Sequence, residues 1–338
     1  MTLLSKQHWH NPTCKERKQK YQLQQISKNK YSDQINVLMR ACTELLFFYL
    51  RQLYFLLPLL SYLLTRFAFF PVRHIYFYKK AIVMNQYIFI DETGSPQFYG
   101  KRKRPLWTDP NFVPIICLGM ISTDDRVRLR NIILDFKQSI LDDILFNSIF
   151  SIRKPGWFLH ASNDHSDINL KTVELLRKLE GFRFHAVIGR KIPDIFIRKH
   201  NGNSTEFYFD LIHKLLALHP VTEGTKYNLF LSQRQSSTVQ RFTDAFEKVL
   251  KAENKDGKIS YHCTVVLSRD FPELSIVDYL LWALQRYILQ GESRYFDAME
   301  HHYEQILDIY ENDGQGRLYT PGDRFELEKA SPFILEKK

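Results

Sequence analysis

Short apolar runs alternate with longer helical patterns from residue 87 to residue 310. The short runs are rich in aromatic and β-branched residues and have the length of strands, whereas the longer segments repeat apolar residues at helical spacing. The predicted strands are Tyr87–Ile90, Val113–Ile121, Phe182–Arg190, Tyr227–Ser232 and Ile259–Leu267. The predicted helices are Asp125–Phe146, Asp167–Leu179, Glu206–Leu218, Val239–Lys251, Leu274–Leu289 and Tyr295–Tyr310. This alternation, after an initial hairpin, predicts an α/β protein with a mixed sheet and helices on both faces.

The pattern divides the chain into an N-terminal extension (1–83), an α/β domain (84–290) and a C-terminal helical tail (291–338). Within the extension, residues 45–64 are rich in Leu and Phe, but Arg51 and Pro58 interrupt them. Each Leu or Phe favours membrane insertion by about 0.3–0.6 kcal/mol, and a central Arg opposes it by about 2.5–3.5 kcal/mol. The summed contributions of residues 45–64 therefore favour membrane insertion only modestly.

Two interpretations of the extension stay open. Residues 45–64 are a membrane anchor in the first, which gives a membrane-attached protein. Met84 is the true start in the second, because the composition changes there and the following residues form a complete pattern of strands and helices. The basic residues on both sides of residues 45–64 give no orientation under the positive-inside rule.

Charge separates the extension from the rest of the chain. The first 83 residues hold 13 Lys and Arg against three Asp and Glu, which leaves 34 of each sign for residues 84–338. The net charge of +10 therefore does not predict a nucleic-acid partner for the α/β domain, where only Lys101–Arg104 is a basic run.

The cysteines and the common motifs exclude several classes of protein. The four cysteines are scattered without a CxxC pair, so neither a zinc site nor a disulfide framework is indicated, and a cytoplasmic location with reduced thiols is the default. The chain has no Walker motif, no Gly-rich phosphate loop and no GxSxG motif. No small-molecule cofactor is evident.

The first candidate site is Asp91-Glu92, which follows the apolar strand Tyr87–Ile90 and precedes Gly94. Carboxylates in this position form an acidic site at the edge of a buried sheet. The alternative is a simple turn, since Asp, Gly and Ser are turn residues.

A second candidate is Asp278, the only charged residue in the apolar segment Leu274–Leu284. A helix that is apolar on all sides is buried, and a buried carboxylate needs a hydrogen bond, an ion pair or a metal. The alternative is a capping box, because Ser275 and Asp278 have the S-x-x-D spacing.

His160 and Asp164 form a third candidate pair, and Arg234 is a fourth candidate. Histidine titrates near neutral pH and, together with carboxylates, holds a divalent ion or moves a proton. The alternative for this pair is a structural role. Arg234 follows a predicted strand and is placed to bind a phosphate, or else to form a surface ion pair.

With these residues in view, the chain from about Asn85 to Gln290 resembles the bacterial and phage family catalogued as domain of unknown function 3800. The segment Tyr87–Gly94 is similar to the family's strand that ends in Asp-Glu-Ser-Gly, with Thr93 in place of Ser. Phe158–Ala161 followed by Asp164 resembles the His-Ala…Asp motif of one branch, and Ser268 with Ile276–Arg286 resembles the closing helix. The resemblance implies a ribonuclease H-like fold.

The resemblance also implies that Asp91 and Asp278 meet at the carboxyl end of the sheet and bind Mg²⁺ or Mn²⁺ for phosphodiester hydrolysis. One departure stands out: the strand Tyr227–Ser232 ends in Ser232-Gln233-Arg234 instead of an acid. Glu92, His160 or Asp164 would then supply the missing ligands.

Two hypotheses follow. The first is a divalent-metal-dependent nuclease or phosphodiesterase. Its site assignments are Asp91, Glu92, His160 and Asp278 as catalytic residues, Asp91, Asp164 and Asp278 as metal ligands, and Arg234 as the phosphate contact. The second is a non-catalytic ribonuclease H-like module that binds a protein or nucleic acid in a mobile-element or phage-conflict setting. The neutral charge of the α/β domain and the missing acid at Ser232 favour this second hypothesis.

Overall fold

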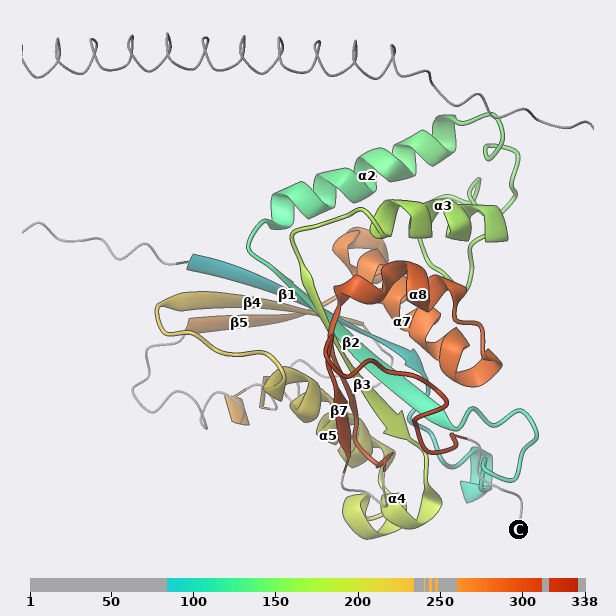
Figure 1. The fold of residues 1–338 in the computed structure, drawn as a ribbon, viewed down its shortest axis with the longest axis vertical. Coiled ribbons are helices and arrows are strands. Elements are labelled where there is room, and N and C mark those ends of the chain that lie inside the picture. The colour runs from blue at the N-terminus through green and yellow to red at the C-terminus, as the bar shows by residue number, and fades with distance from the viewer. Residues whose placement is uncertain are drawn as a thin grey trace, which may run out of the picture. The chain divides into compact units, whose positions relative to one another are not determined.

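The computed structural model describes most of the chain after the N-terminal extension (Figure 1). The described residues are 84–233, 240, 243, 244, 247, 248, 260–311 and 316–333. The extension with both of its interpretations, Arg234 and most of the predicted helix Val239–Lys251 lie outside them. Among the described residues, no helix combines the length and the apolar character needed to cross a membrane.

A seven-stranded mixed sheet lies at the centre, in the order β5–β4–β1–β2–β3–β6–β7. Strand β2 is antiparallel to its neighbours β1 and β3, whereas β4 and β5 run parallel to β1, and β6 runs parallel to β3. The strands are β1 (Met84–Gly94), β2 (Ile115–Thr123), β3 (Arg183–Arg190), β4 (Thr225–Ser232), β5 (Ser260–Val266), β6 (Tyr303–Asp308) and β7 (Arg317–Tyr319). The predicted mixed α/β sheet is confirmed, and this topology is consistent with a ribonuclease H-like fold.

Helices cover both faces of the sheet, as Figure 1 shows. One face packs against α2 (Arg126–Asp142), α3 (Ser166–Leu176), α7 (Glu273–Gln290) and α8 (Arg294–Met299). The other packs against α4 (Pro193–His200) and α5 (Ser204–Ala217). Three 3₁₀ turns, η1 (Lys101–Lys103), η2 (Ser268–Asp270) and η3 (Glu300–His302), complete the described elements. Helix α7 is buried along most of its length, as its apolar sequence predicts.

The predicted first strand is longer than its apolar run. Strand β1 continues through Asp91 to Gly94 and pairs with β2 over this part, whereas its parallel pairing with β4 ends where Ile90 lies opposite Leu231. The turn interpretation of Asp91 is therefore wrong: the residue lies inside a strand, beside the end of β4. Backbone pairing with β2 keeps the polar residues 91–93 extended.

The predicted helical tail is wrong beyond its first turns. Helix α8 ends at Met299, and Tyr303–Asp308 form β6, which adds to the open edge of β3. The apolar residues of this segment suit a helix or a strand, and the unpaired backbone groups of β3 decide between them. Strands β6 and β7 of this segment thus extend the sheet.

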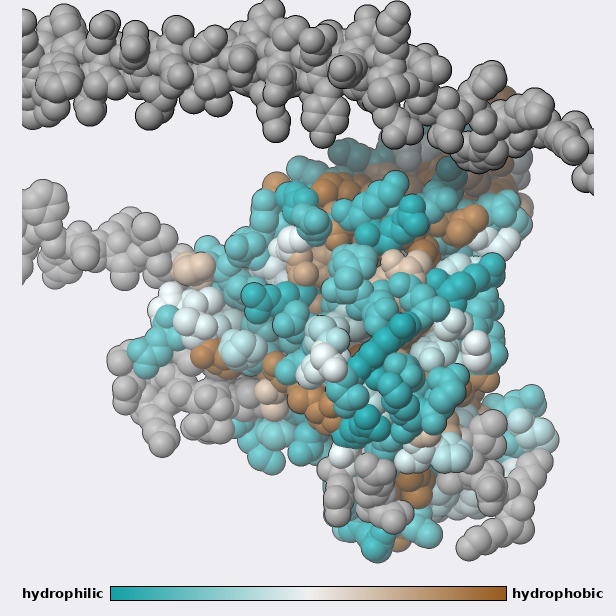
Figure 2. Space-filling view, in the orientation of Figure 1, coloured by the Kyte–Doolittle hydropathy of each residue, from teal (hydrophilic) through white to brown (hydrophobic). Residues whose placement is uncertain are grey.

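Helix α2 also ends earlier than predicted. The pattern placed Ile144 and Leu145 on its apolar face, but these side chains are 81% and 75% exposed. Figure 2 shows that hydrophilic residues cover much of the described surface in this view, with apolar residues in smaller groups between them. Helix α4 was not predicted; its Pro193 stands at the start, where proline is tolerated.

Candidate functional site

The carboxyl half of β1 lies against α7 and thereby brings two distant carboxylates to one face of the sheet. Side chains alternate along a strand, so Asp91 shares a face with Phe89 and Thr93. Phe89 belongs to the core around α7, and the Thr93 hydroxyl donates to Oε1 of Gln285 on α7 at 2.9 Å. Asp278 lies on the same helix, and its charge contributes to the raised pKa of Asp91. Asp91 and Asp278 therefore lie on the same face of the sheet, where the charge of Asp278 reaches Asp91.

A glycine in β2 permits this close approach. Gly119 is the register partner of Asp91, and a Cβ placed on it would lie 2.7 Å from the Phe184 ring and 3.0 Å from Leu281 of α7. Real Cβ atoms do not approach a ring that closely, so a side chain at residue 119 would have to displace Phe184 of β3 and would crowd Leu281 of α7.

Asp91 is held by hydrogen bonds at the end of β4. Its Oδ1 accepts from the Glu92 N–H at 2.9 Å, and the Ser232 hydroxyl also donates to this carboxylate. Burial raises the pKa of Asp91 well above its usual value, and the charges of Glu92 and Asp278 raise it further. Ser232, whose Oγ is 2.7 Å from that of Ser268, thus binds Asp91 from the position where an acid was expected.

Asp278 lies beside the loop that carries His160. Its Oδ2 accepts from the Ala161 N–H at 2.7 Å and is 3.6 Å from Nδ1 of His160. Burial raises the pKa of Asp278, while His160 and the Ala161 N–H oppose that rise. The side chains of Asp278 and His160 remain 16% and 33% exposed, so small molecules in solvent can reach both groups.

The capping-box alternative for Asp278 is wrong. Helix α7 begins at Glu273, which puts Ser275 inside it, and the Ser275 hydroxyl donates to the Leu159 carbonyl at 2.8 Å. Ser275 and Asp278 therefore both hold the 159–161 loop against the helix.

Asp164 has a different place from the one predicted. Its Oδ1 accepts from Trp157 Nε1 at 2.8 Å, and its Oδ2 accepts from the His160 N–H at 2.7 Å and the Tyr279 hydroxyl at 2.9 Å. Both oxygens are thus occupied within the loop and α7. Burial raises the pKa of Asp164, and its charge in turn raises that of Asp278. These contacts give Asp164 a positioning role toward the His160 loop.

Glu92 is not brought together with Asp91 and Asp278. The strand alternation turns it to the opposite face, where its Oε2 accepts from the Tyr208 hydroxyl of α5 at 3.0 Å. The predicted catalytic role of Glu92 therefore has no support in the geometry.

Some contacts of the site were not predicted from the sequence. Ser275, considered only as part of a capping box, lies one helical turn before Asp278, and residues three or four apart on a helix share a face. Tyr279 directly follows Asp278 and donates to Asp164, and the Asn169 amide donates to the Ala161 carbonyl at 3.0 Å. Nothing in the sequence indicated Asn169 or the Ala161 N–H.

The donor set of the site fits a hard cation with few protein ligands. Asp278 approaches the His160 imidazole, and Asp91 lies on the same face of the sheet, yet within the described part of the chain no three His, Cys, Asp or Glu side chains gather closely enough to hold a metal by themselves. Mg²⁺ commonly takes only one or two carboxylates and completes its shell with water and substrate phosphate. Asp91 and Asp278 fit that arrangement better than a preformed two-metal cage.

A basic cavity of about 340 Å³ adjoins the same loop. Arg130, Lys137 and Arg269 line it together with the Phe158 ring, which lies edge-on to His160 with 5.8 Å between ring centroids. Leu159 and Ser275 also line it, as does Asp270, whose Oδ1 is 3.7 Å from Nε of Arg269. The cavity therefore reaches the residues that hold Asp278 and combines positive charge with an aromatic face.

No protein-family model matches this chain, and no curated protein was found to match it. The fold and the geometry define the class: an α/β protein with a mixed sheet consistent with a ribonuclease H-like fold, with two partly buried carboxylates from β1 and α7 on one face.

Replacing Asp91 with asparagine is expected to raise the free energy of unfolding at pH 8 by about 1–2 kcal/mol, measured with a chelator present. The folded pKa of Asp91 lies above its unfolded value, so ionisation opposes folding. This cost is absent at pH values below the pKa of Asp91 in the unfolded chain, and it is complete at pH values above the pKa of Asp91 in the folded protein. The gain from Asp91→Asn should accordingly fade as the pH falls.

Urea unfolding at a series of pH values measures this effect. Asp135→Asn, which removes an exposed carboxylate from α2, is the matched control and should change little at any pH. A loss of stability in Asp91→Asn at pH 8, or a gain that does not depend on pH, would contradict the assignment.

Proposed function

We propose that this protein is a Mg²⁺- or Mn²⁺-dependent phosphodiesterase that acts on nucleic acid. The observation that carries the proposal is that Asp91 of β1 and Asp278 of α7 lie on one face of the sheet and that burial raises the pKa of both carboxylates. Neighbouring carboxylates withdrawn from water are costly unless a positive charge compensates them. A divalent cation is the compensation that hard carboxylate oxygens favour.

Asp91 and Asp278 would hold the metal, which when bound supplies a Lewis acid for a phosphoryl oxygen and a more acidic water. His160 is placed to move a proton, because it is one-third exposed and its Nδ1 lies 3.6 Å from Asp278. Asp164 holds the His160 backbone, and Ala161 holds the Asp278 carboxylate. These contacts set the distance between the acid and the imidazole.

The basic cavity supports nucleic acid as the substrate class. Arg130, Lys137 and Arg269 outnumber the one carboxylate of the lining, Asp270, and so leave net positive charge for phosphates. Phe158 offers a ring on which a base can stack. Arg130 is held in place by Glu273, with 3.3 Å between Nη1 and Oε2. These groups would take the phosphate-binding role that was predicted for Arg234, a residue outside the described part of the chain.

The second candidate is a non-catalytic ribonuclease H-like binding module. Two observations favour it: Ser232 stands where an acid was expected, and the described residues contain no cluster of three metal-ligating side chains. This module would bind its partner without any need for a divalent ion.

Metal titration distinguishes the two functions. We expect Mg²⁺ or Mn²⁺ at about 100 times its Kd to stabilise the full chain by about 2.7 kcal/mol, which corresponds to a rise in Tm of about 5 °C or more. The rise should vanish in the double variant Asp91→Asn/Asp278→Asn and persist in Asp135→Asn.

The same samples are then incubated with single- and double-stranded DNA and RNA. Metal-dependent cleavage together with the Tm shift supports the phosphodiesterase. Absence of both the shift and the cleavage would favour the binding module.

A further inference from the structure

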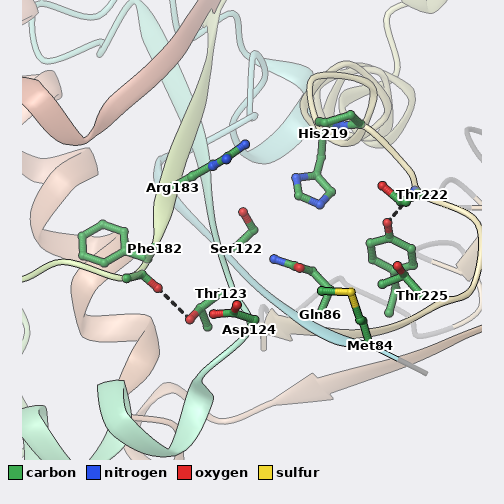
Figure 3. Close-up of a pocket in the computed structure, with 13 residues that line it drawn as sticks. Met84, Gln86, Ser122, Thr123, Asp124, Phe182, Arg183, His219, Thr222 and Thr225 are labelled. Carbon is green, nitrogen blue, oxygen red and sulfur yellow. Dashed lines mark hydrogen bonds between the residues drawn. The ribbon is translucent and has the colours of Figure 1, made fainter. Parts of the chain in front are cut away.

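A second polar cavity, of about 430 Å³, lies at the other end of β1 from the acidic site (Figure 3). Gln86 of β1, Ser122 of β2, Arg183 of β3 and His219, which follows α5, contribute side chains to it. Gln86 and Asp91 are five residues apart on β1, so about 16 Å separates them along the strand.

The cavity also opens on the other face of the sheet. Gln86 shares a face with Ile88 and Ile90, which belong to the core around α5, whereas Asp91 faces α7. The cavity and the candidate phosphodiesterase site therefore lie at opposite ends of β1 and on opposite faces of the sheet. Nothing in the proposed hydrolysis uses the cavity.

Arg183 gives the cavity its positive charge. It is exposed, and no carboxylate of the described residues forms an ion pair with its guanidinium. Figure 3 shows this guanidinium, the His219 ring, the Ser122 hydroxyl and the Gln86 amide directed toward one space. An unpaired guanidinium beside neutral hydrogen-bonding groups is suited to a carboxylate or phosphate.

His219 adds a neutral hydrogen-bonding group. Its ring lines the cavity, and its buried Nδ1 has no hydrogen-bond partner among the residues that the structure describes. Burial, together with the charges of His185 and Arg183, lowers the pKa of His219 to about 4, so the imidazole is neutral at pH 7. A neutral ring carries one N–H donor and one acceptor. It can therefore bind an anion or a hydroxyl group.

The other lining groups limit the ligand further. The Thr123 hydroxyl already donates to the Gly181 carbonyl at 2.8 Å, and the Tyr227 hydroxyl accepts from the Thr222 N–H at 2.8 Å. Asp124 is exposed at the rim and would repel a second negative group. A ligand with one anionic group and with hydroxyl or amino groups elsewhere satisfies all of these neighbours.

We propose that this cavity binds a small organic anion whose carboxylate or phosphate pairs with Arg183 and whose polar groups hydrogen-bond to Gln86, Ser122 and His219. The volume lies within the range of small-molecule pockets. The anion makes its charged contact at the first residue of β3, and His219 closes the cavity from the α5 side.

Histidine-ring NMR of the full chain, titrated with inorganic phosphate and separately with lactate at constant ionic strength, tests the proposal. The His219 resonance, assigned with His219→Gln, should shift and saturate. Arg183→Gln should weaken binding about tenfold or more, the loss of one charge-assisted pair. Arg177→Gln, which removes an exposed charge from the end of α3, should bind as the parent does.

Saturation with phosphate alone identifies a phosphate-bearing ligand, and saturation with lactate alone identifies a hydroxy acid or a related carboxylate. Urea unfolding of Arg183→Gln should match the parent, because the side chain is exposed and unpaired among the described residues. Absence of a saturable His219 shift with both probes overturns the proposal, as does equal weakening in Arg177→Gln. None of these measurements depends on whether the protein hydrolyses nucleic acid.

Discussion

Replacing Asp278 with asparagine is expected to lower metal-dependent cleavage of nucleic acid by about 10²–10³-fold, the loss typical of one well-placed electrostatic group. Asparagine keeps the shape of the side chain and an oxygen that can accept from the Ala161 N–H. It removes the negative charge that would hold the cation next to Asp91. We therefore expect the variant to lose cleavage activity while it keeps its fold.

Initial rates of cleavage of a labelled oligonucleotide at saturating Mn²⁺ measure this effect. Asp167→Asn, which removes an exposed carboxylate on α3, should retain full activity. Asp278→Asn should also keep or raise the Tm without metal, because the buried charge that raises the folded-state free energy is gone. Activity of Asp278→Asn equal to that of Asp167→Asn would remove Asp278 from the site.

Replacing Glu273 with alanine is expected to destabilise the fold by about 3 kcal/mol, the lower end of the range for breaking a buried ion pair. Glu273 is fully buried at the start of α7 and pairs with Arg126 at 2.8 Å and with Arg130 at 3.3 Å. The Arg126 guanidinium also lies over the Phe230 ring, 4.8 Å from its centroid. Removing the carboxylate leaves this cation between α2 and the sheet without its counter-charge.

The lower end of the range applies because Arg126 and Arg130 remain 25% and 34% exposed and water partly compensates them. Urea unfolding measures the loss. Glu174→Ala, which breaks an exposed pair with Lys171, should change stability by less than about 0.5–1 kcal/mol. A loss in Glu273→Ala no larger than in this control would show that the buried pair contributes nothing measurable.

Arg130 connects the two predictions. It pairs with Glu273 and lines the basic cavity beside Phe158, so Glu273→Ala should also weaken binding of nucleic acid while Asp91 and Asp278 stay in place. The helix α2–α7 contact thus holds both the fold and the proposed phosphate-binding groups.

Most strands and helices could be predicted because their apolar spacing records which face is buried. The all-apolar sequence of α7 predicted a buried helix, and the alternation in β3 and β4 predicted strands. A segment whose apolar residues suit both the helical period and the strand period was assigned wrongly. Tyr303–Asp308 is such a segment, and the open edge of β3 made it a strand.

By itself, the sequence determined that Asp91 stands after a short apolar run and that Asp278 is a lone charge on a buried helix, because local composition and period are enough for both conclusions. It could not choose between a site, a turn and a capping box, since those depend on contacts between residues far apart in the chain. Only the tertiary structure decided that Asp91 and Asp278 share one face while Glu92 lies on the other, and that Asp164 uses both oxygens to hold the His160 loop. The physical reason is that the pleat of β1 and its packing against α7 set which carboxylates face the helix.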